Sequence, residues 1–334
     1  MEALSDKGSA NKKVNRLIYI IVLDKYKSLT KGYLKGRIRA TAKFFINNSA
    51  LARSILINKE YAASKSEYCY NIWMQHFGNW RKLNDSVPDV VIEIGSGNSL
   101  GVGLSALLSG ASKFYALEKT QFWNDSTNLR IFDELVERFQ KEINSNNREE
   151  NSINHLLTNE HLEKCLEKDR IEKIRNELEH PHNPNNTFVR SIIPWSDKEH
   201  IEDHTVDLIC SHTVLQHIND LDFMYEKMNR WLKKGGCISH TVDLRSLNTS
   251  KLWNGHWTYS VKEWKIVTGG INLINREPIS THLNLLKKYN FEIKFKKITT
   301  MKNKLLRSEL AERYRNLKEI DLTSSGLYYF AKVN

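Results

Sequence analysis

The chain has 334 residues, of which 40% are hydrophobic, and a formal net charge of +11 at pH 7. That length allows one large domain or two modest ones, and the hydrophobic content is enough for a real core, which argues against a disordered chain. The four cysteines form no C-x-x-C pair. We therefore expect free, buried thiols in a reducing cytosol rather than disulfides or a metal centre.

The first 60 residues carry most of the positive charge. They contain 13 Lys/Arg and 4 Asp/Glu, a net +9, and the rest of the chain is nearly balanced. A solvated helical face explains this charge most simply, although contact with an anionic membrane or a nucleic acid stays open. The apolar run at residues 17–23 is shorter than the about 20 residues that span a bilayer, and no cleavage site follows it. We predict a cytoplasmic protein, with peripheral membrane contact through this segment as an alternative.

An N-terminal helical region is predicted for residues 1–87. Between residues 14 and 85, apolar residues recur at helical spacing with few helix breakers. The clearest stripe predicts a helix that packs against a sheet, and it consists of Tyr70, Trp73, Met74, Phe77 and Trp80. Tyr68 and His76 on the same stretch are candidates for lining a site, although packing is the simpler role for each.

A strand, a glycine-rich turn and a second strand follow. The apolar run at residues 90–94 is typical of a parallel strand buried on both faces. Glycines in the turn at residues 95–101 allow a tight bend and a close approach of backbone to a ligand. The next strand, residues 111–118, ends in Glu118, whose carboxylate can accept hydrogen bonds from a ribose diol. This arrangement predicts a Rossmann-type half-site for a nucleoside cofactor.

Two details of the turn favour one kind of cofactor over another. Glu93 lies inside the end of the first strand, and Gly101 comes one residue later than the G-x-G-x-x-G pattern places its third glycine. A carboxylate beside the loop repels a pyrophosphate but attracts an ammonium or a sulfonium.

These features resemble motif I of the class I S-adenosylmethionine-dependent methyltransferases, and the resemblance continues downstream. Residues 205–218 resemble the fourth strand and following loop of that family, and residues 228–240 resemble its helix, Gly-Gly turn and fifth strand. Lys234 stands where proline is usual. The order of these motifs matches the family over roughly residues 88–245.

The resemblance implies an α/β fold, a Rossmann-like seven-stranded methyltransferase sheet with an N-terminal helical region and helical and aromatic insertions. It also implies S-adenosylmethionine as the cofactor, with Glu118 holding the ribose hydroxyls. In many relatives an acid after the third strand, here residues 188–193, contacts the adenine. Ser196 or Asp197 occupies that loop in this chain. The expected cofactor contacts are Glu93, Gly95, Ser96, Gly97, Gly101, Glu118, Lys119, Ser196, Ser211 and His212.

The methyltransferase domain is predicted to cover residues 88–334, with two insertions. Charged helices over residues 128–180 make the stretch from about 121 to 187 longer than a crossover requires. An aromatic-rich insertion occupies residues 246–288, where Gly269 and Gly270 are a candidate hinge. Residues 291–300 and 326–333 are predicted to form a final antiparallel strand pair.

A narrower resemblance concerns the acceptor. Residues 239–245, 252–257 and 274–278 look like those of methyltransferases encoded among bacterial surface-polysaccharide and secondary-metabolite genes. That resemblance implies O-methylation of a polar small molecule, such as a saccharide or related metabolite. An N- or C-methyltransferase stays open, because the acceptor pocket is built from the segments that align least well.

A hydroxyl nucleophile needs a base or a metal, and this fold places the acceptor at the carboxyl ends of its strands. The catalytic candidates there are His217 after the fourth strand, and His240 and Asp243 after the fifth, with Asp243 orienting the imidazole or a substrate hydroxyl. His256 lies between two tryptophans and is expected to complete a saccharide-binding wall. No acidic cluster with metal spacing follows the fourth strand, so we predict no metal site.

Three other functions compete with this interpretation. A dinucleotide oxidoreductase explains the glycines and Glu118, but it explains neither Glu93 nor the later strands. An RNA methyltransferase is favoured by the basic N-terminus, but no nucleotide-recognition module accompanies it. A non-catalytic scaffold would not need the acids of the cofactor site. The oligomeric state cannot be read from the sequence.

Overall fold

The computed structural model describes residue 34 and residues 62–145, 152–195, 201–269 and 273–334. Apart from Leu34, the basic segment at residues 1–60 lies outside the described residues, as do the expected adenine contacts Ser196 and Asp197. In the described part no helix is long and apolar enough to cross a membrane.

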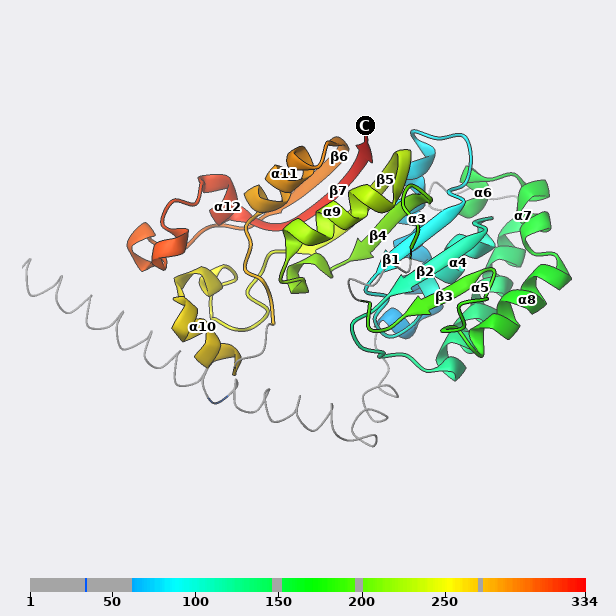
Figure 1. Cartoon of the computed structure of the whole chain (residues 1–334), viewed down its shortest axis with the longest axis horizontal. Helices are drawn as coiled ribbons and strands as arrows, with labels where there is room; N and C mark the ends of the chain where they lie inside the picture. Colours follow the sequence, from blue (N-terminus) through cyan, green and yellow to red (C-terminus); the bar gives the residue numbers. More distant parts are fainter. Residues whose placement is uncertain (1–33, 35–61, 146–151, 196–200, 270–272) are drawn as a thin grey trace, which may run out of the picture.

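Seven strands form one mixed sheet in the order β3-β2-β1-β4-β5-β7-β6 (Figure 1). The first five strands along the chain pair in parallel, and β7 lies antiparallel between β5 and β6. The strands are β1 (Val90–Ile94), β2 (Lys113–Leu117), β3 (Val189–Ile192), β4 (Val206–His212), β5 (Leu232–Asp243), β6 (Phe291–Thr300) and β7 (Ser324–Val333). This topology confirms the predicted α/β class and the Rossmann-like sheet.

Helices cover both faces of the sheet and bury separate apolar layers. One layer packs α3 (Ser66–Arg81), α4 (Gly101–Leu108) and α5 (Asp125–Ile143) against the sheet. The other layer packs α9 (Leu221–Trp231) and α11 (Ile279–Lys288). The predicted stripe of α3 is confirmed, since all five of its residues are at most 8% exposed.

Helices fill the long connection between β2 and β3, as the charged pattern over residues 128–180 predicted. After α5 the chain forms α6 (Ile153–Leu156), α7 (Asn159–Cys165) and α8 (Lys168–Leu178). Arg170 of α8 donates to the carbonyls of Leu107 and Ala111, and this ties α8 to the end of α4. The connection therefore extends the apolar layer that α3, α4 and α5 form on the sheet.

The predicted Gly-Gly turn before the fifth strand differs from the structure. Helix α9 ends at Trp231 and β5 begins at Leu232, so both glycines lie inside the strand. The pairing of β4 with β5 shifts register between Val206 and Leu208. Gly235, with a φ of +82°, adopts a left-handed conformation that suits glycine best. The glycines therefore allow an irregularity within β5 and do not form a separate turn before it.

A separate aromatic subdomain, residues 246–269, 273–276 and 301–323, packs beyond the carboxyl end of β5. It contains η3 (Gly255–Thr258), α10 (Val261–Thr268), η4 (Arg307–Glu309), η5 (Glu312–Tyr314) and α12 (Glu319–Thr323). Two small apolar clusters form its core, one around Trp257 and one around Trp264. The packing of residues 301–323 on Trp257 was not predicted. Gly269 ends α10 in a left-handed conformation, and Gly270 lies outside the described residues.

Arg276 joins the two clusters of the aromatic subdomain. Its guanidinium lies 4.7 Å from the ring centroid of Trp264 and 5.3 Å from that of Tyr314. It also donates to the carbonyls of His256 and Tyr259. A buried guanidinium held by two rings and two carbonyls fixes the chain around it. The aromatic residues thus build a packed support rather than an open surface.

Two helical glycines give opposite predictions for the same substitution. A Cβ at Gly103 of α4 would lie 2.1 Å from the Phe114 ring, whereas a Cβ at Gly78 of α3 would meet nothing within 4 Å. We expect Gly103→Ala to lower the free energy of unfolding by about 1–3 kcal/mol through overpacking. Gly78→Ala should raise it by about 0.5–1 kcal/mol through helix propensity. Urea denaturation of both variants measures this, and shifts of the same sign would contradict the packing.

Candidate functional site

The loop after β1 closes on the residue that follows β2. Glu118 accepts hydrogen bonds through Oε1 from the Gly97 backbone N–H at 2.6 Å and from the Ser96 hydroxyl at 3.1 Å. Gly95 and Gly97 have φ values of +75° and +70°, which a residue with a side chain rarely adopts. A Cβ at Gly95 would also lie 2.5 Å from Val214, beyond β4. Glycine is therefore required where the two loops touch.

Glu93 is a buried carboxyl with an unsatisfied oxygen. It is 4% exposed, and its Oε2 has no hydrogen-bond partner. Burial, with a further contribution from Glu118, raises the pKa of Glu93 to about 8. Burial also raises the pKa of Glu118 to about 7, against the bonds from Gly97 and Ser96. Two acids buried near each other without a cation are costly, so the site is suited to a positively charged ligand.

Tyr68 of α3 contacts His212 of β4 and lies close to Glu93. Their rings meet edge-to-face with centroids 6.1 Å apart, and the charge of Glu93 contributes to raising the pKa of Tyr68. Nδ1 of His212 is buried without a partner, and burial lowers the pKa of this imidazole. His76 lies deeper, where its Nδ1 is 2.7 Å from the Ser239 hydroxyl. Tyr68 is thus the member of the predicted pair that faces the cofactor acids.

The other expected cofactor contacts occupy mixed positions. Gly101 begins α4, and a Cβ there would lie 2.4 Å from Sγ of Cys69, so this glycine allows α3 to approach closely. Lys119 is exposed. Ser211 is 1% exposed and lies with its hydroxyl 2.7 Å from Nδ1 of His240. Of these residues, Lys119 alone is open to solvent.

The expected pairing of His240 with Asp243 is not formed. Residues three apart on a strand point to opposite faces, and these two residues lie at that spacing on β5. His240 is fully buried, and burial holds its pKa well below the usual range. Asp243 instead binds Arg245 through two side-chain hydrogen bonds of 2.9 and 2.7 Å. Those bonds lower the pKa of Asp243 against the effect of burial.

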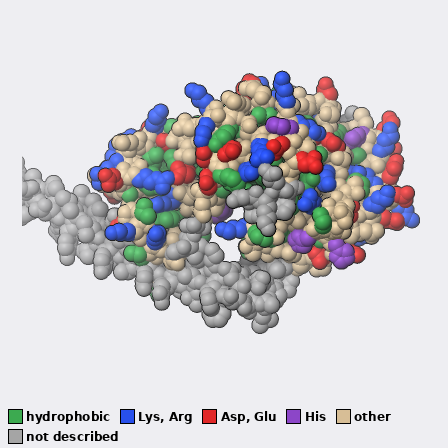
Figure 2. All heavy atoms as spheres, viewed as in Figure 1, with side chains coloured by type: hydrophobic (Ala, Val, Ile, Leu, Met, Phe, Trp, Pro, Cys, Tyr) green, Lys and Arg blue, Asp and Glu red, His purple; other side chains and the backbone are tan. Residues whose placement is uncertain are grey.

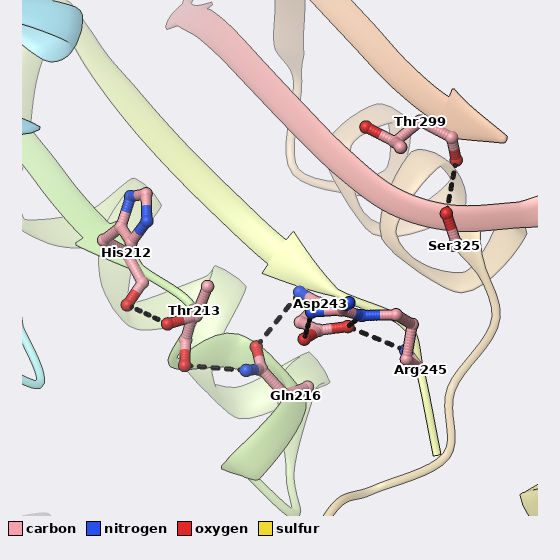
Figure 3. A network of polar contacts seen from close by, with 7 residues as sticks. All are labelled: His212, Thr213, Gln216, Asp243, Arg245, Thr299 and Ser325. Carbon is pink, nitrogen blue, oxygen red and sulfur yellow. Dashed lines mark hydrogen bonds and ion pairs between the residues drawn. The ribbon is translucent and has the colours of Figure 1, made fainter. Parts of the chain in front are cut away.

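A polar network gathers at the carboxyl ends of β4 and β5 (Figure 3). The Gln216 amide donates to the Thr213 carbonyl at 2.7 Å and accepts from the Asp243 backbone N–H at 3.4 Å. Thr213 has a φ of +57°, a strained conformation for a β-branched residue and one found at functional sites. Beyond β5, the Ser325 hydroxyl donates to the Thr299 carbonyl at 3.1 Å. This edge offers hydroxyl, amide and charged groups.

His217 is the predicted histidine that is exposed at this edge. It ends the short helix η2 (Leu215–His217), and its Nδ1 lies 2.5 Å from the Leu273 carbonyl oxygen. A carbonyl only accepts, so Nδ1 carries the proton and Nε2 of the neutral ring keeps a lone pair. Asp243 is close enough for His217 to contribute to lowering its pKa.

His256 is enclosed and does not complete the expected saccharide wall. It is 1% exposed, and its ring lies 4.7 Å from that of Trp257, which is itself fully buried. Burial, together with the charge of Arg276, lowers the pKa of His256 to about 3. Asp243 acts on this histidine in the opposite direction. His256 therefore lies behind the polar edge, within electrostatic reach of it.

Sequence reasoning missed the residue that fixes η2 in place. The Asn275 amide donates to the carbonyls of Leu215 and Ile218, each at 2.8 Å, and its backbone N–H donates to Gln216. No local sequence motif predicts these hydrogen bonds, because the partners of Asn275 lie about sixty positions earlier in the chain. Asn275 thereby connects the aromatic subdomain to the loop that carries His217.

Comparison with known sequences adds an independent observation. Residues 182–239 match the sequence model of a methyltransferase domain family, and they cover β3, β4, α9 and most of β5. These residues are thus similar to part of a methyltransferase domain. None of the curated proteins compared with the chain matches it.

Solved structures similar to this chain come from several organisms. One is an S-adenosylmethionine-dependent methyltransferase from Mesorhizobium loti, 13% identical, with a TM-score of 0.38 over 76% of this chain and 96% of that one. Another, from Methanosarcina mazei, is 12% identical, with a TM-score of 0.40 over 74% and 93%. A third is phosphoethanolamine N-methyltransferase 2 of Haemonchus contortus, 13% identical, with a TM-score of 0.39 over 84% and 59%.

Buried histidines predict how the stability of this protein depends on pH. His282 is fully buried with Nδ1 3.0 Å from the Tyr225 hydroxyl, and burial lowers its pKa to about 4. The unfolded chain binds that proton near pH 6.5, so the free energy of unfolding falls as the pH decreases below that value. Between pH 7 and 5 the wild type should lose about 2 kcal/mol more than His282→Gln. Denaturant titrations at both pH values test this, and parallel curves would show that His282 is not kept neutral.

Proposed function

We propose that this protein is a class I S-adenosylmethionine-dependent methyltransferase that acts on a hydroxyl group of a polar small molecule, a saccharide or related metabolite. The observation that carries the proposal is the polar edge, where exposed His217 lies near Asp243 and donates through Nδ1 to the Leu273 carbonyl, so that Nε2 is the nitrogen left to act as a base. A hydroxyl acceptor needs such a base, and the surrounding hydroxyl, amide and charged groups suit a ligand rich in hydroxyls. Backbone and side chains from β4, β5 and η2 meet there.

In the proposed cofactor site, two acids bind different parts of the cofactor. Bound S-adenosylmethionine supplies a methyl group on a positively charged sulfur. Glu93, buried and lacking a partner at Oε2, would bind the cofactor's ammonium, and Glu118 would accept from the ribose hydroxyls. Gly95 and Gly97 allow the backbone to approach. Tyr68 and His212 would shield this region from water, which favours positioning of the reactants.

We assign the base to His217 rather than to His240 or His256, because the latter two are enclosed. The Leu273 carbonyl fixes the proton on Nδ1 of His217, so Nε2 can take the proton of the acceptor hydroxyl. Asp243 would stabilise the imidazolium that forms, while Arg245 holds the carboxylate in place. His240 and His256 would then support the site from behind it.

We further propose that the domain covers residues 88–334, with a helical region before it and insertions at about 121–187 and 246–288. Helix α3 of the preceding region packs directly on the sheet. The four cysteines are buried and unpaired, which suits a reducing compartment such as the cytoplasm.

Calorimetric titration with S-adenosylmethionine and S-adenosylhomocysteine tests the cofactor assignment. Glu118→Ala should weaken binding at least about tenfold, equivalent to about 1.4 kcal/mol, and Glu137→Ala, at an exposed position of α5, serves as the control. Because the pKa values of Glu93 and Glu118 lie near 8 and 7, a cationic ligand should release protons and bind more tightly as the pH rises through these values. Unchanged affinity in Glu118→Ala would contradict the assigned role.

An acceptor screen with methyl-labelled cofactor tests the reaction itself, beginning with free and lipid-linked sugars. We expect labelled methyl ethers, and we expect His217→Gln to lower kcat by about 10²–10⁴-fold with little effect on cofactor affinity. Transfer to amines alone would contradict O-methylation. Full activity of His217→Gln would remove His217 from the mechanism without affecting the cofactor site.

A further inference from the structure

The charges after residue 60 nearly cancel in total, but positive and negative residues are concentrated in different parts of the chain. Residues 61–245 contain 21 Lys/Arg and 28 Asp/Glu, a net −7, whereas residues 246–334 contain 16 Lys/Arg and 7 Asp/Glu, a net +9. The cofactor half is therefore acidic, and the aromatic subdomain with the last two strands is basic. Such polarity orients a protein toward an anionic partner.

The densest part of this charge is the basic edge, which we define as residues 294–307. It contains six Lys/Arg and no Asp/Glu, and all six basic residues are exposed. The segment comprises most of β6, the last strand in the order of the sheet, and continues into the aromatic subdomain. The basic residues are Lys294, Lys296, Lys297, Lys302, Lys304 and Arg307.

Large apolar side chains protrude from the same edge. Phe295, Met301 and Leu306 are 41%, 43% and 62% exposed. Lysines alone on an edge strand can be explained as protection against unwanted strand pairing. Exposed apolar residues among them have the opposite effect, so edge protection does not account for this segment. Figure 2 shows hydrophobic and basic side chains next to each other over the end of the molecule that carries α10 and α12.

We propose that the basic edge docks on an anionic lipid surface. Interspersed basic and apolar side chains suit a membrane interface, where the charges contact phosphate groups and the apolar groups enter the acyl boundary. A second copy of the chain that docked through the same edge would bring two strongly positive surfaces together. Single-stranded nucleic acid binds through aromatic stacking, whereas two of the three exposed apolar residues, Met301 and Leu306, are aliphatic.

Docking would also orient the polar edge at the carboxyl ends of β4 and β5, which we call the acceptor edge because we place the acceptor there. The Trp253 indole donates to the Lys302 carbonyl at 3.1 Å, and the Asn254 amide donates to the Asn303 side chain at 3.0 Å. These bonds tie the basic edge to the chain that follows β5. The edge therefore holds the aromatic subdomain, and with it η2, in a fixed relation to the surface. This inference does not depend on which acceptor group is methylated.

Cosedimentation of the full-length protein with vesicles tests the proposal, using phosphatidylcholine with and without phosphatidylserine. We expect binding only to the anionic vesicles, and we expect Lys296→Glu/Lys297→Glu to weaken it about tenfold or more. The matched control is Lys168→Glu/Lys173→Glu, which makes the same charge change on exposed positions of α8 and should bind like the wild type. Phe295→Ser/Leu306→Ser should also weaken binding, and circular dichroism confirms that each variant is folded.

Four outcomes would overturn the proposal. The wild type fails to bind anionic vesicles, or the edge variants bind as tightly as the wild type, which would assign binding to residues elsewhere. In the third, vesicle binding survives while the edge variants lose affinity for single-stranded RNA, which would identify the edge as a nucleic-acid surface. Equal loss in the α8 control would show that total charge, not this edge, is responsible.

Discussion

Two buried carboxyl groups, those of Glu93 and Glu118, constrain the rest of the cofactor half. The parallel register of β1 and β2 brings the ends of these strands to one edge of the sheet, with Glu93 opposite Ala116 and Glu118 just beyond. Burial disfavours their charged forms, so the backbone around them must supply donors or leave room for a cation. The glycine loop supplies the donors at Glu118, whereas Oε2 of Glu93 keeps no hydrogen-bond partner. The conformation of that loop follows from this requirement.

The acceptor edge is supported by a different kind of packing. The cofactor half rests on two large apolar layers that share the sheet, whereas the aromatic subdomain depends on two small clusters and on Arg276 between them. Only a few polar bonds, chiefly those of Asn275, carry its position to η2. The two halves can therefore vary separately, with cofactor binding retained while the acceptor edge is remodelled.

The sequence revealed the cofactor half well because its signals are local. A buried run, a glycine turn and a terminal acid within thirty residues predict strand, loop and ligand together, and the stripe of α3 predicts its buried face. The acceptor edge depends on contacts distant in sequence, such as Leu305 and Tyr314 on Trp257, for which no periodic pattern exists. The separation of His240 from Asp243 was within reach, because strand alternation alone places them on opposite faces. The hydrogen bonds that Asn275 donates had no comparable signal.

The contact between Gly95 and Val214 has a kinetic consequence. Residue 95 has no room for a side chain because Val214 precedes η2 directly at that point. If the glycine loop rearranges when the cofactor binds, the segment that carries His217 must therefore move with it. We expect an ordered cycle, in which the nucleotide ligand enters first and leaves last, so that the acceptor meets an assembled base and departs before the spent cofactor is exchanged.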